Sequence, residues 1–191
     1  GDITKIGDYA FKGLTNVTSV NIAKTVTSIG KYAFNGIPGL TEVTLGDSIE
    51  EIGEYAFGSC NGITSLTFGK QLKTIGDYAF YQCENLPKVT IPSNVTNIGS
   101  GAFMKCTKLT NVGLNDGLKG IGSYAFSETG LTYISIPETV EDIGAYAFKN
   151  CTALADVTIY GKAPQIASTA FYGDTAYCLT PDYDSSWDST I

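Results

Sequence analysis

Residue types that carry much of protein chemistry are missing or scarce in this chain. It has no histidine, and all 12 basic residues are lysines, against 19 acidic residues and a net charge of −7. Because phosphate binding needs clustered arginine or lysine, an acidic chain without arginine is not expected to bind nucleic acid. Without histidine, the usual general base for a serine or cysteine nucleophile is also missing. No apolar run approaches the length of about 18 residues that would span a membrane.

The dominant feature of the sequence is a tandem repeat. The phrase Ile-Gly-x-Tyr-Ala-Phe recurs with a spacing of 23 residues, shortened once to 22. The copies, of which the last is decayed, begin at Ile6, Ile29, Ile52, Ile75, Ile98, Ile121, Ile143 and Ile166. The deletion falls between Phe126 and Leu131, which indicates a surface turn there. A period of this length predicts a solenoid, with about eight repeats over residues 1–191 in a single domain.

Each repeat contains one pair of aliphatic residues two positions apart, such as Val112 and Leu114. This alternation predicts a short strand with both side chains directed inward. The equivalent pairs are Val20/Ile22, Val43/Leu45, Leu66/Phe68, Val89/Ile91, Ile134/Ile136 and Val157/Ile159. In the Gly-x-Tyr-Ala-Phe-x-x-Cys stretch, apolar residues are three and four apart, which predicts a single helical or 3₁₀ turn on the opposite side. Stacked copies would then bury their apolar side chains against one another.

The two ends of the array differ. The first copy opens in mid-repeat at Ile3 without a polar capping segment, so we expect further protein upstream. The last copy departs from the pattern and leads to Cys178 and to Trp187, the single tryptophan. Such an atypical terminal repeat predicts that residues 163–191 form a degenerate last repeat and a C-terminal cap.

The repeat phrase, with the cysteine, leucine, valine and Ile-Pro positions that follow it, resembles BspA-like, Treponema-type leucine-rich repeats. The resemblance covers roughly residues 3–180. It implies an α/β repeat solenoid, a right-handed leucine-rich-repeat coil with a parallel β-sheet on its concave face and short helical or 3₁₀ turns opposite. It also implies a secreted or surface-attached protein of a host-associated microbe that binds host matrix proteins, host cells or other microbes. The resemblance brings no catalytic residues with it.

Four of the five cysteines occupy one repeat position, which holds Leu14 and Ile37 in the first two copies. They are Cys60, Cys83, Cys106 and Cys151. A position shared with leucine and isoleucine predicts a buried core site, where cysteine acts as a small apolar residue. A line of thiols without histidine does not predict a metal site. Cys178 is out of register with the others, and its pairing with Cys151 stays an alternative.

Three further residue types follow the same period. The tyrosines Tyr9, Tyr32, Tyr55, Tyr78, Tyr124 and Tyr146 form a column that only Gly101 interrupts. We interpret the column as a structural ladder of rings, with an aromatic track for glycan or protein contact as the alternative. The acidic residues Asp8, Glu54 and Asp77 share one position and are expected to be solvated charges. The periodic glycines are interpreted as turn residues that allow close stacking. We therefore predict no catalytic residue, no cofactor and no enzymatic activity.

A binding site is expected on the outward positions of the strands, because solenoids bind through their sheet. These positions are small, rich in hydroxyl groups and nearly uncharged. The candidate residues are Glu42, Thr44, Thr67, Lys88, Thr90, Tyr133 and Asp156. The predicted function is a monomeric, extracellular or cell-surface recognition or adhesion module. Its expected partners are host matrix or cell-surface proteins, other microbial surface proteins, or glycans. The alternative is a structural spacer that holds other domains of a larger surface protein away from the cell.

Overall fold

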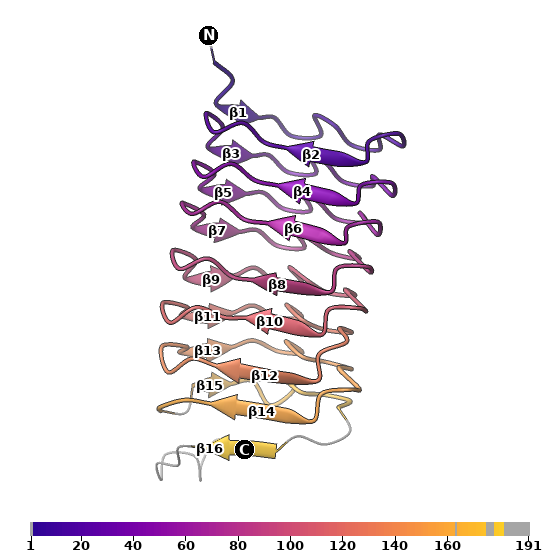
Figure 1. Cartoon of the computed structure of the whole chain (residues 1–191). Helices are drawn as coiled ribbons and strands as arrows, with labels where there is room; N and C mark the ends of the chain where they lie inside the picture. Colours follow the sequence, from indigo (N-terminus) through magenta and orange to yellow (C-terminus); the bar gives the residue numbers. More distant parts are fainter. Residues whose placement is uncertain (1, 163, 175–177, 182–191) are drawn as a thin grey trace.

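The chain winds into a stack of parallel coils, each with a two-residue strand on one side and a longer strand on the other (Figure 1). This structure is a computed structural model that describes residues 2–162, 164–174 and 178–181. As the chain descends in Figure 1, the longer strands in front run to the left and the short strands behind run to the right. The coil is therefore right-handed, as the family resemblance implies.

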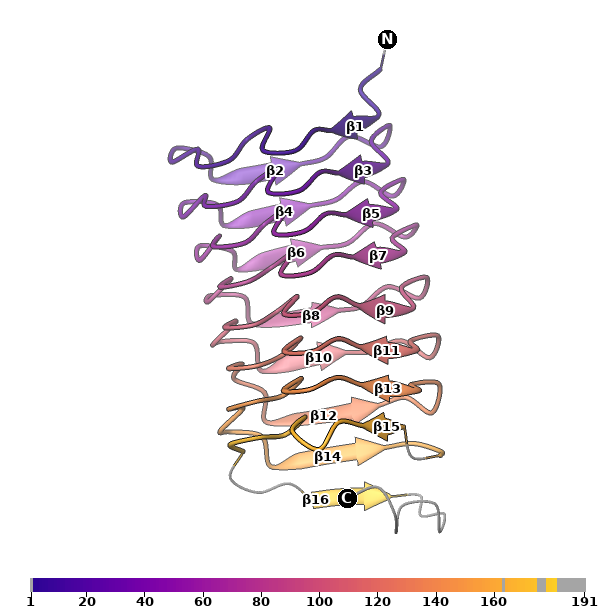
Figure 2. The same ribbon diagram turned by 180° about the vertical axis from the view of Figure 1, so that it is seen from behind.

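The short strands form one continuous eight-stranded parallel sheet, seen from its own side in Figure 2. They are β1 (Lys5–Ile6), β3 (Ser28–Ile29), β5 (Glu51–Ile52), β7 (Thr74–Ile75), β9 (Asn97–Ile98), β11 (Gly120–Ile121), β13 (Asp142–Ile143) and β15 (Gln165–Ile166). Each isoleucine is in register with the isoleucine of the next coil, as Ile52 is with Ile75. Ile52 and Ile75 are buried. The repeat phrase thus begins in a strand, which the sequence did not predict.

The longer strands occur where the alternating aliphatic pairs predicted them. They are β2 (Ser19–Asn21), β4 (Glu42–Thr44), β6 (Ser65–Thr67), β8 (Lys88–Thr90), β10 (Asn111–Gly113), β12 (Tyr133–Ile136) and β14 (Asp156–Ile159). An additional strand, β16 (Cys178–Pro181), pairs in parallel with β14 and lies within the segment interpreted as the cap. Trp187 and the rest of that predicted cap at 182–191 lie outside the described residues.

The predicted helical or 3₁₀ turns opposite the longer strands are wrong, because the described part of the chain contains no helix. The backbone explains the difference. Tyr32 has a φ of 55°, in the left-handed region, which a right-handed helical turn does not allow. Its N–H donates to Glu54 O of the next coil at 2.9 Å, and Phe34 N–H donates to Ala56 O at 2.7 Å. These backbone groups bond between coils, so they are not available for a helix.

Buried side chains from both strand series and from the turns fill the interior of the coil. The largest are phenylalanines that stack from one coil to the next, with ring centroids 5.4 Å apart for Phe57–Phe80 and for Phe80–Phe103. The column continues through Phe126 and Phe148, which are also fully buried. In the first coil, Phe11 remains 42% exposed because it has a stacking neighbour on one side only, Phe34.

Candidate functional site

All seven predicted face residues lie on the longer strands and outside the core. Glu42 and Thr44 are on β4, Thr67 on β6, Lys88 and Thr90 on β8, Tyr133 on β12, and Asp156 on β14. Thr44 is half-buried and the others are exposed. The register places Thr44 beside Thr67 and Tyr133 beside Asp156. These two pairs are neighbours, but the seven residues do not form one continuous surface.

Two breaks divide the longer-strand face into three sheets, β2-β4-β6, β8-β10 and β12-β14-β16. The first break has a covalent cause. At one repeat position, Thr41 N–H donates to Thr18 O at 2.8 Å and Thr64 N–H donates to Thr41 O at 2.9 Å. Pro87 occupies this position in the next coil, and proline has no N–H to donate to Thr64 O. The ladder between β6 and β8 is therefore interrupted at its first bond.

The bond at the other end of the same two strands is missing as well. In the preceding pair of coils, Leu45 N–H donates to Thr67 O at 3.0 Å. The equivalent bond, from Phe68 N–H to Thr90 O, does not form between these two described coils. The edges of β6 and β8 thus face each other with backbone groups that the solenoid itself leaves without partners.

The second break lies between β10 and β12, in the coil that carries the one-residue deletion. A side-chain bond crosses it, from Asn111 Nδ2 to Tyr133 Oη at 2.6 Å. Tyr133 is 44% exposed and is positioned by this bond. The single aromatic residue of the predicted face is therefore anchored to the neighbouring sheet.

A cleft of about 470 Å³ lies at the first break. Its walls include Thr67 and Thr90 from the predicted face, and its apolar surface comes from Leu66, Phe68 and Val89. Leu66 and Phe68 are only partly buried. In the preceding coil, the equivalent residues Val43 and Leu45 are 0% and 3% exposed. At the break, Leu66 and Phe68 are therefore more exposed than the equivalent pair of the preceding coil.

Two lysines, Lys70 and Lys88, also line this cleft. Lys70 forms an exposed ion pair with Asp47 at 3.3 Å. Lys88 has no ion-pair partner among the residues that the structure describes. Its neighbour in register, Asn111, is uncharged. The cleft therefore combines an apolar surface with positive charge on a chain whose net charge is −7.

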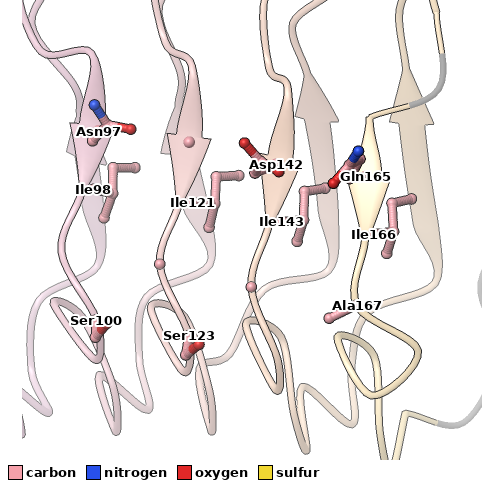
Figure 3. A pocket seen from close by; sticks show the side chains of 13 residues that line it. Asn97, Ile98, Ser100, Ile121, Ser123, Asp142, Ile143, Gln165, Ile166 and Ala167 are labelled. Atoms are coloured by element: carbon pink, nitrogen blue, oxygen red, sulfur yellow. The ribbon is translucent and has the colours of Figure 1, made fainter.

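The short-strand side carries a separate groove that the sequence did not predict. It has a volume of about 590 Å³ and runs across β9, β11, β13 and β15 (Figure 3). Asn97, Asp142 and Gln165 lie along one edge, and Ser100 and Ser123 lie along the other. Between these two polar edges, the groove is lined by the isoleucines of the repeat phrase, such as Ile121 and Ile143. A strand of two residues shows no alternation of buried and exposed side chains, so this groove could not be predicted from the sequence.

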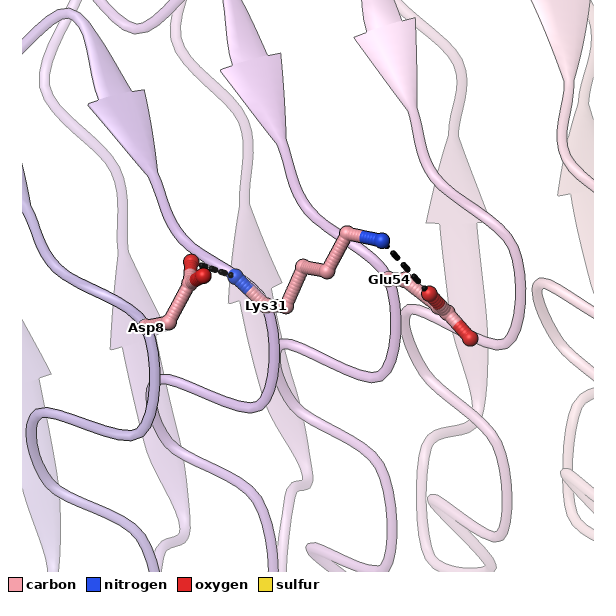
Figure 4. A network of polar contacts seen from close by, with 3 residues as sticks. All are labelled: Asp8, Lys31 and Glu54. Carbon is pink, nitrogen blue, oxygen red and sulfur yellow. Dashed lines mark hydrogen bonds and ion pairs between the residues drawn. The ribbon is translucent and has the colours of Figure 1, made fainter.

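The acidic column on the same side is more ordered than the sequence suggested. Asp8 Oδ1 accepts a hydrogen bond from Lys31 N–H at 2.8 Å, and Lys31 Nζ lies 3.1 Å from Glu54 (Figure 4). Asp77 Oδ1 accepts from Ser100 N–H at 2.7 Å. The interpretation as merely solvated charges is therefore incomplete. Asp8 and Asp77 are exposed, but they also join adjacent coils.

The four cysteines in the repeat register are buried, as predicted, and all are free thiols. Cys151 is among these free thiols, and the side chain of Cys178, its alternative partner in the sequence analysis, lies outside the described part of the structure. Burial raises the pKa of Cys60 and of Cys151 to about 11. Because the thiolate is the reactive form, these groups are poor nucleophiles and poor metal ligands at neutral pH.

The tyrosine column is a stacked ladder, as predicted. Ring centroids lie 5.2 Å apart for Tyr9–Tyr32 and 4.8 Å apart for Tyr55–Tyr78, with nearly parallel planes. Each ring covers the face of the next, so mainly ring edges are left for solvent. Gly101 interrupts the ladder, as the sequence indicated. Tyr78 leans into the space that a side chain there would need.

A comparison with protein families gives a match over most of the chain. Residues 4–113 and 73–180 match the model of the BspA type leucine-rich repeat region, which contains 6 copies of the repeat. The chain belongs to the BspA-type leucine-rich repeat family. The matched family model describes a repeat and not a catalytic domain. No curated protein sequence matches the chain.

Solved structures support this membership of the BspA-type family. A leucine-rich cell surface protein from Faecalibacterium prausnitzii is 38% identical, with a TM-score of 0.75, over 82% of this chain and 43% of its own. A leucine-rich repeat protein from Bacteroides ovatus is 26% identical, with a TM-score of 0.54, over 93% of this chain and 59% of its own. A leucine-rich repeat protein of T. pallidum has the same fold at 24% identity, with a TM-score of 0.74, over 91% of this chain and 77% of its own.

The BspA-type chain thus spans about half the length of the first two of these structures. In the part of the chain that the structure describes, no helical segment has the length and hydrophobicity needed to cross a membrane.

Proposed function

We propose that this chain is a non-enzymatic protein-recognition module that binds its partner through the longer-strand face. The observation that carries the proposal is the cleft between β6 and β8. It is the place on this face where partly exposed apolar side chains, backbone groups without partners and a lysine without an ion pair occur together. A binding site in a repeat protein needs a departure from the repeat, because identical coils present identical surfaces.

We further propose that the module acts outside the cell or at the cell surface, as part of a larger protein. The similar protein of F. prausnitzii is named a leucine-rich cell surface protein, and this chain spans 43% of its length. The proposed partners are host matrix or cell-surface proteins, or surface proteins of other microbes. Glycans are the second class, because the rest of the face is rich in hydroxyl groups.

Binding of the folded chain to a panel of purified host matrix proteins and to a glycan array tests this function. Substitution of Thr67, Lys88 and Thr90, the predicted face residues that line the cleft, by alanine should weaken the binding found. The matched control replaces Asn97, Asp142 and Gln165 on the short-strand side by alanine and should leave binding unchanged. A folded chain that binds nothing on either array refutes the proposal. Equal losses in both variants would place the site elsewhere.

A spacer function is the second candidate, and one observation favours it. Away from the cleft, the outward positions are mostly small residues such as Thr44 and Ser135, which offer no anchor for a partner. A spacer should tolerate removal of two adjacent 23-residue repeats outside the cleft without loss of binding by the whole surface protein. Removal of the two repeats that form the cleft should then be equally harmless. A loss confined to the second deletion supports recognition instead.

A further inference from the structure

We propose that the cleft between β6 and β8 binds an extended acidic peptide segment of the partner, with one large apolar side chain inserted between the two coils. This inference rests on the proposed recognition function and specifies its site and the chemistry of its ligand. The backbone break, the apolar surface and the charge of the cleft support it separately.

The opening between β6 and β8 follows from the covalent structure of one residue, Pro87. On the short-strand side, β7 and β9 of the same two coils are paired in register, Thr74 with Asn97 and Ile75 with Ile98. On the longer-strand side, Pro87 has no N–H for Thr64 O, and β6 and β8 are not paired anywhere along their described length. The two coils are thus joined on one side and open on the other. The gap does not depend on a change in conformation.

The surface inside the opening is apolar. Leu66 and Phe68 are partly exposed there, beside Val89. Phe68 is held edge-on against the fully buried Phe80, with ring centroids 5.6 Å apart and planes at 74°. Since Phe80 is fixed by the stacked core, its contact with Phe68 holds the Phe68 ring in place at the side of the cleft. An aliphatic or aromatic side chain of a partner fits such a surface, because its insertion removes apolar area from water on both sides.

The backbone groups at the opening select an extended ligand. Thr64 O can accept a hydrogen bond and Phe68 N–H can donate one, and neither has a partner within the described coils. An extended peptide presents donors and acceptors at alternating positions, as in peptide recognition at other strand edges. A full strand does not fit between β6 and β8, since their coils remain joined through β7 and β9. The ligand therefore lies along the opening and inserts only its anchor side chain.

The charges at the cleft select an acidic segment. Lys70 and Lys88 line the cleft, and its described lining contains no aspartate or glutamate. Asp47 lies beside the lining and already pairs with Lys70. Lys88 is therefore the group left for a ligand carboxylate. Because the chain as a whole is acidic, an acidic segment is repelled elsewhere and attracted here, which gives the cleft its selectivity.

Fluorescence anisotropy with short labelled peptides tests this assignment on the full 191-residue chain. The first peptide has a central leucine flanked by glutamates. The second replaces the glutamates by lysines, and the third replaces the leucine by glycine. The wild type should bind the first peptide about tenfold more tightly than either of the others. The preference over the lysine peptide should shrink at high salt, because screening weakens the ionic contribution.

Three variants locate the site. Pro87→Thr restores the missing N–H, so it should close the cleft and abolish peptide binding. Slower hydrogen exchange of the Phe68 amide reports the closure independently of any ligand. Lys88→Glu should reverse the preference from the glutamate peptide to the lysine peptide. Lys119→Ala, an exposed lysine that precedes β11 on the other side, is the matched control and should change nothing.

Several results would overturn the assignment. The first is equal binding of all three peptides. The second is unchanged peptide binding by Pro87→Thr although its Phe68 amide has become protected. The third is a Phe68 amide that exchanges in Pro87→Thr at the same rate as in the wild type. The proposed function is judged separately. A matrix-protein partner that binds wild type and Pro87→Thr equally refutes the cleft as the site and leaves recognition intact. The absence of any protein or glycan partner refutes recognition, whatever the peptides show.

Discussion

The thiol of Cys83 donates a hydrogen bond to the carbonyl oxygen of Phe57, in the preceding coil, at 3.3 Å. The same contact recurs wherever the repeat has cysteine at this position. Sγ–O distances are 3.0 Å for Cys60–Phe34, 3.2 Å for Cys106–Phe80 and 3.0 Å for Cys151–Phe126. Thr129 fills the position in the sixth copy, and its hydroxyl donates instead to the carbonyl oxygen of Phe126 in its own coil, at 2.9 Å. The position is therefore a buried donor site and not merely a small apolar one.

This contact predicts that the stability of the fold depends more on a hydrogen-bond donor at residue 83 than on the shape of the side chain there. Threonine and valine are nearly isosteric, but only threonine has a hydroxyl that can donate to a buried carbonyl oxygen. Cys83→Val leaves a buried carbonyl without a partner and should lower the free energy of unfolding by about 1–3 kcal/mol more than Cys83→Thr. Urea denaturation of the two variants measures the difference. Burial raises the pKa of Cys83 well above its ordinary value, so the wild-type donor is present at neutral pH.

Ile37 provides the control for this pair, because the preceding carbonyl there belongs to Phe11, in the partly exposed first coil. Water can satisfy that carbonyl, so Ile37→Thr should be no more stable than Ile37→Val. If threonine is favoured over valine equally at both positions, the donor is not the reason for cysteine in the repeat.

The sequence predicted the elements that have a periodicity of their own. Alternating pairs such as Val89 and Ile91 located all seven longer strands up to β14, because one face of each is buried. The short strands escaped detection because two residues cannot alternate. The turns were misread as helical because the spacing from Ala33 to Phe34 and Ile37 fits a helix as well as a tight turn. Inter-coil bonds decide between the two, and these depend on the neighbouring coil.

The candidate site was predicted only in part. The sequence placed Thr67, Lys88 and Thr90 on the right surface, but it treated that surface as continuous. The break at Pro87 was visible as a proline where other copies have Thr18, Thr41 and Thr64. Its significance depends on knowing that the N–H at this position bonds to the preceding coil. That knowledge comes from the register of the coils and not from the pattern of one repeat.

Close stacking predicts that the same substitution destabilises the chain at one glycine and not at an equivalent one. A Cβ added at Gly53 would lie 2.8 Å from Gly30 C and from Lys31 N, which are backbone atoms that cannot move aside. A Cβ at Gly7, in the first coil, meets nothing within 4 Å. Gly53→Ala should therefore cost about 1–3 kcal/mol of stability, whereas Gly7→Ala should stay within about 0.5 kcal/mol of wild type. Urea melts of the two variants that coincide would contradict this account of the stacking.

The phenylalanine column predicts how unfolding spreads along the array. Phe80 is fully buried and stacks on Phe57 and Phe103. Phe80→Ala should cost about 3–5 kcal/mol. Since each coil contacts only its neighbours, that loss should split unfolding into two steps. Phe11→Ala, at a side chain 42% exposed, should cost less and leave a single transition. Calorimetry distinguishes these outcomes, and one unchanged cooperative transition in Phe80→Ala would argue against the core assignment.

Asp174 stands three residues after Phe171, as each cysteine of the repeat stands after its phenylalanine, and it therefore occupies the donor position of the last described coil. Burial raises the pKa of Asp174 to about 6, against a smaller lowering by the backbone of Cys151. The folded chain then takes up a proton at higher pH than the unfolded chain, so this group's contribution to stability increases as the pH falls from about 7 to about 4.

Asp174→Cys and Asp174→Asn remove the buried charge. Both should melt above wild type at pH 8, with a difference that vanishes near pH 4. Melting curves across this range check the prediction, and a difference that is independent of pH would show that Asp174 is solvated and outside the donor position.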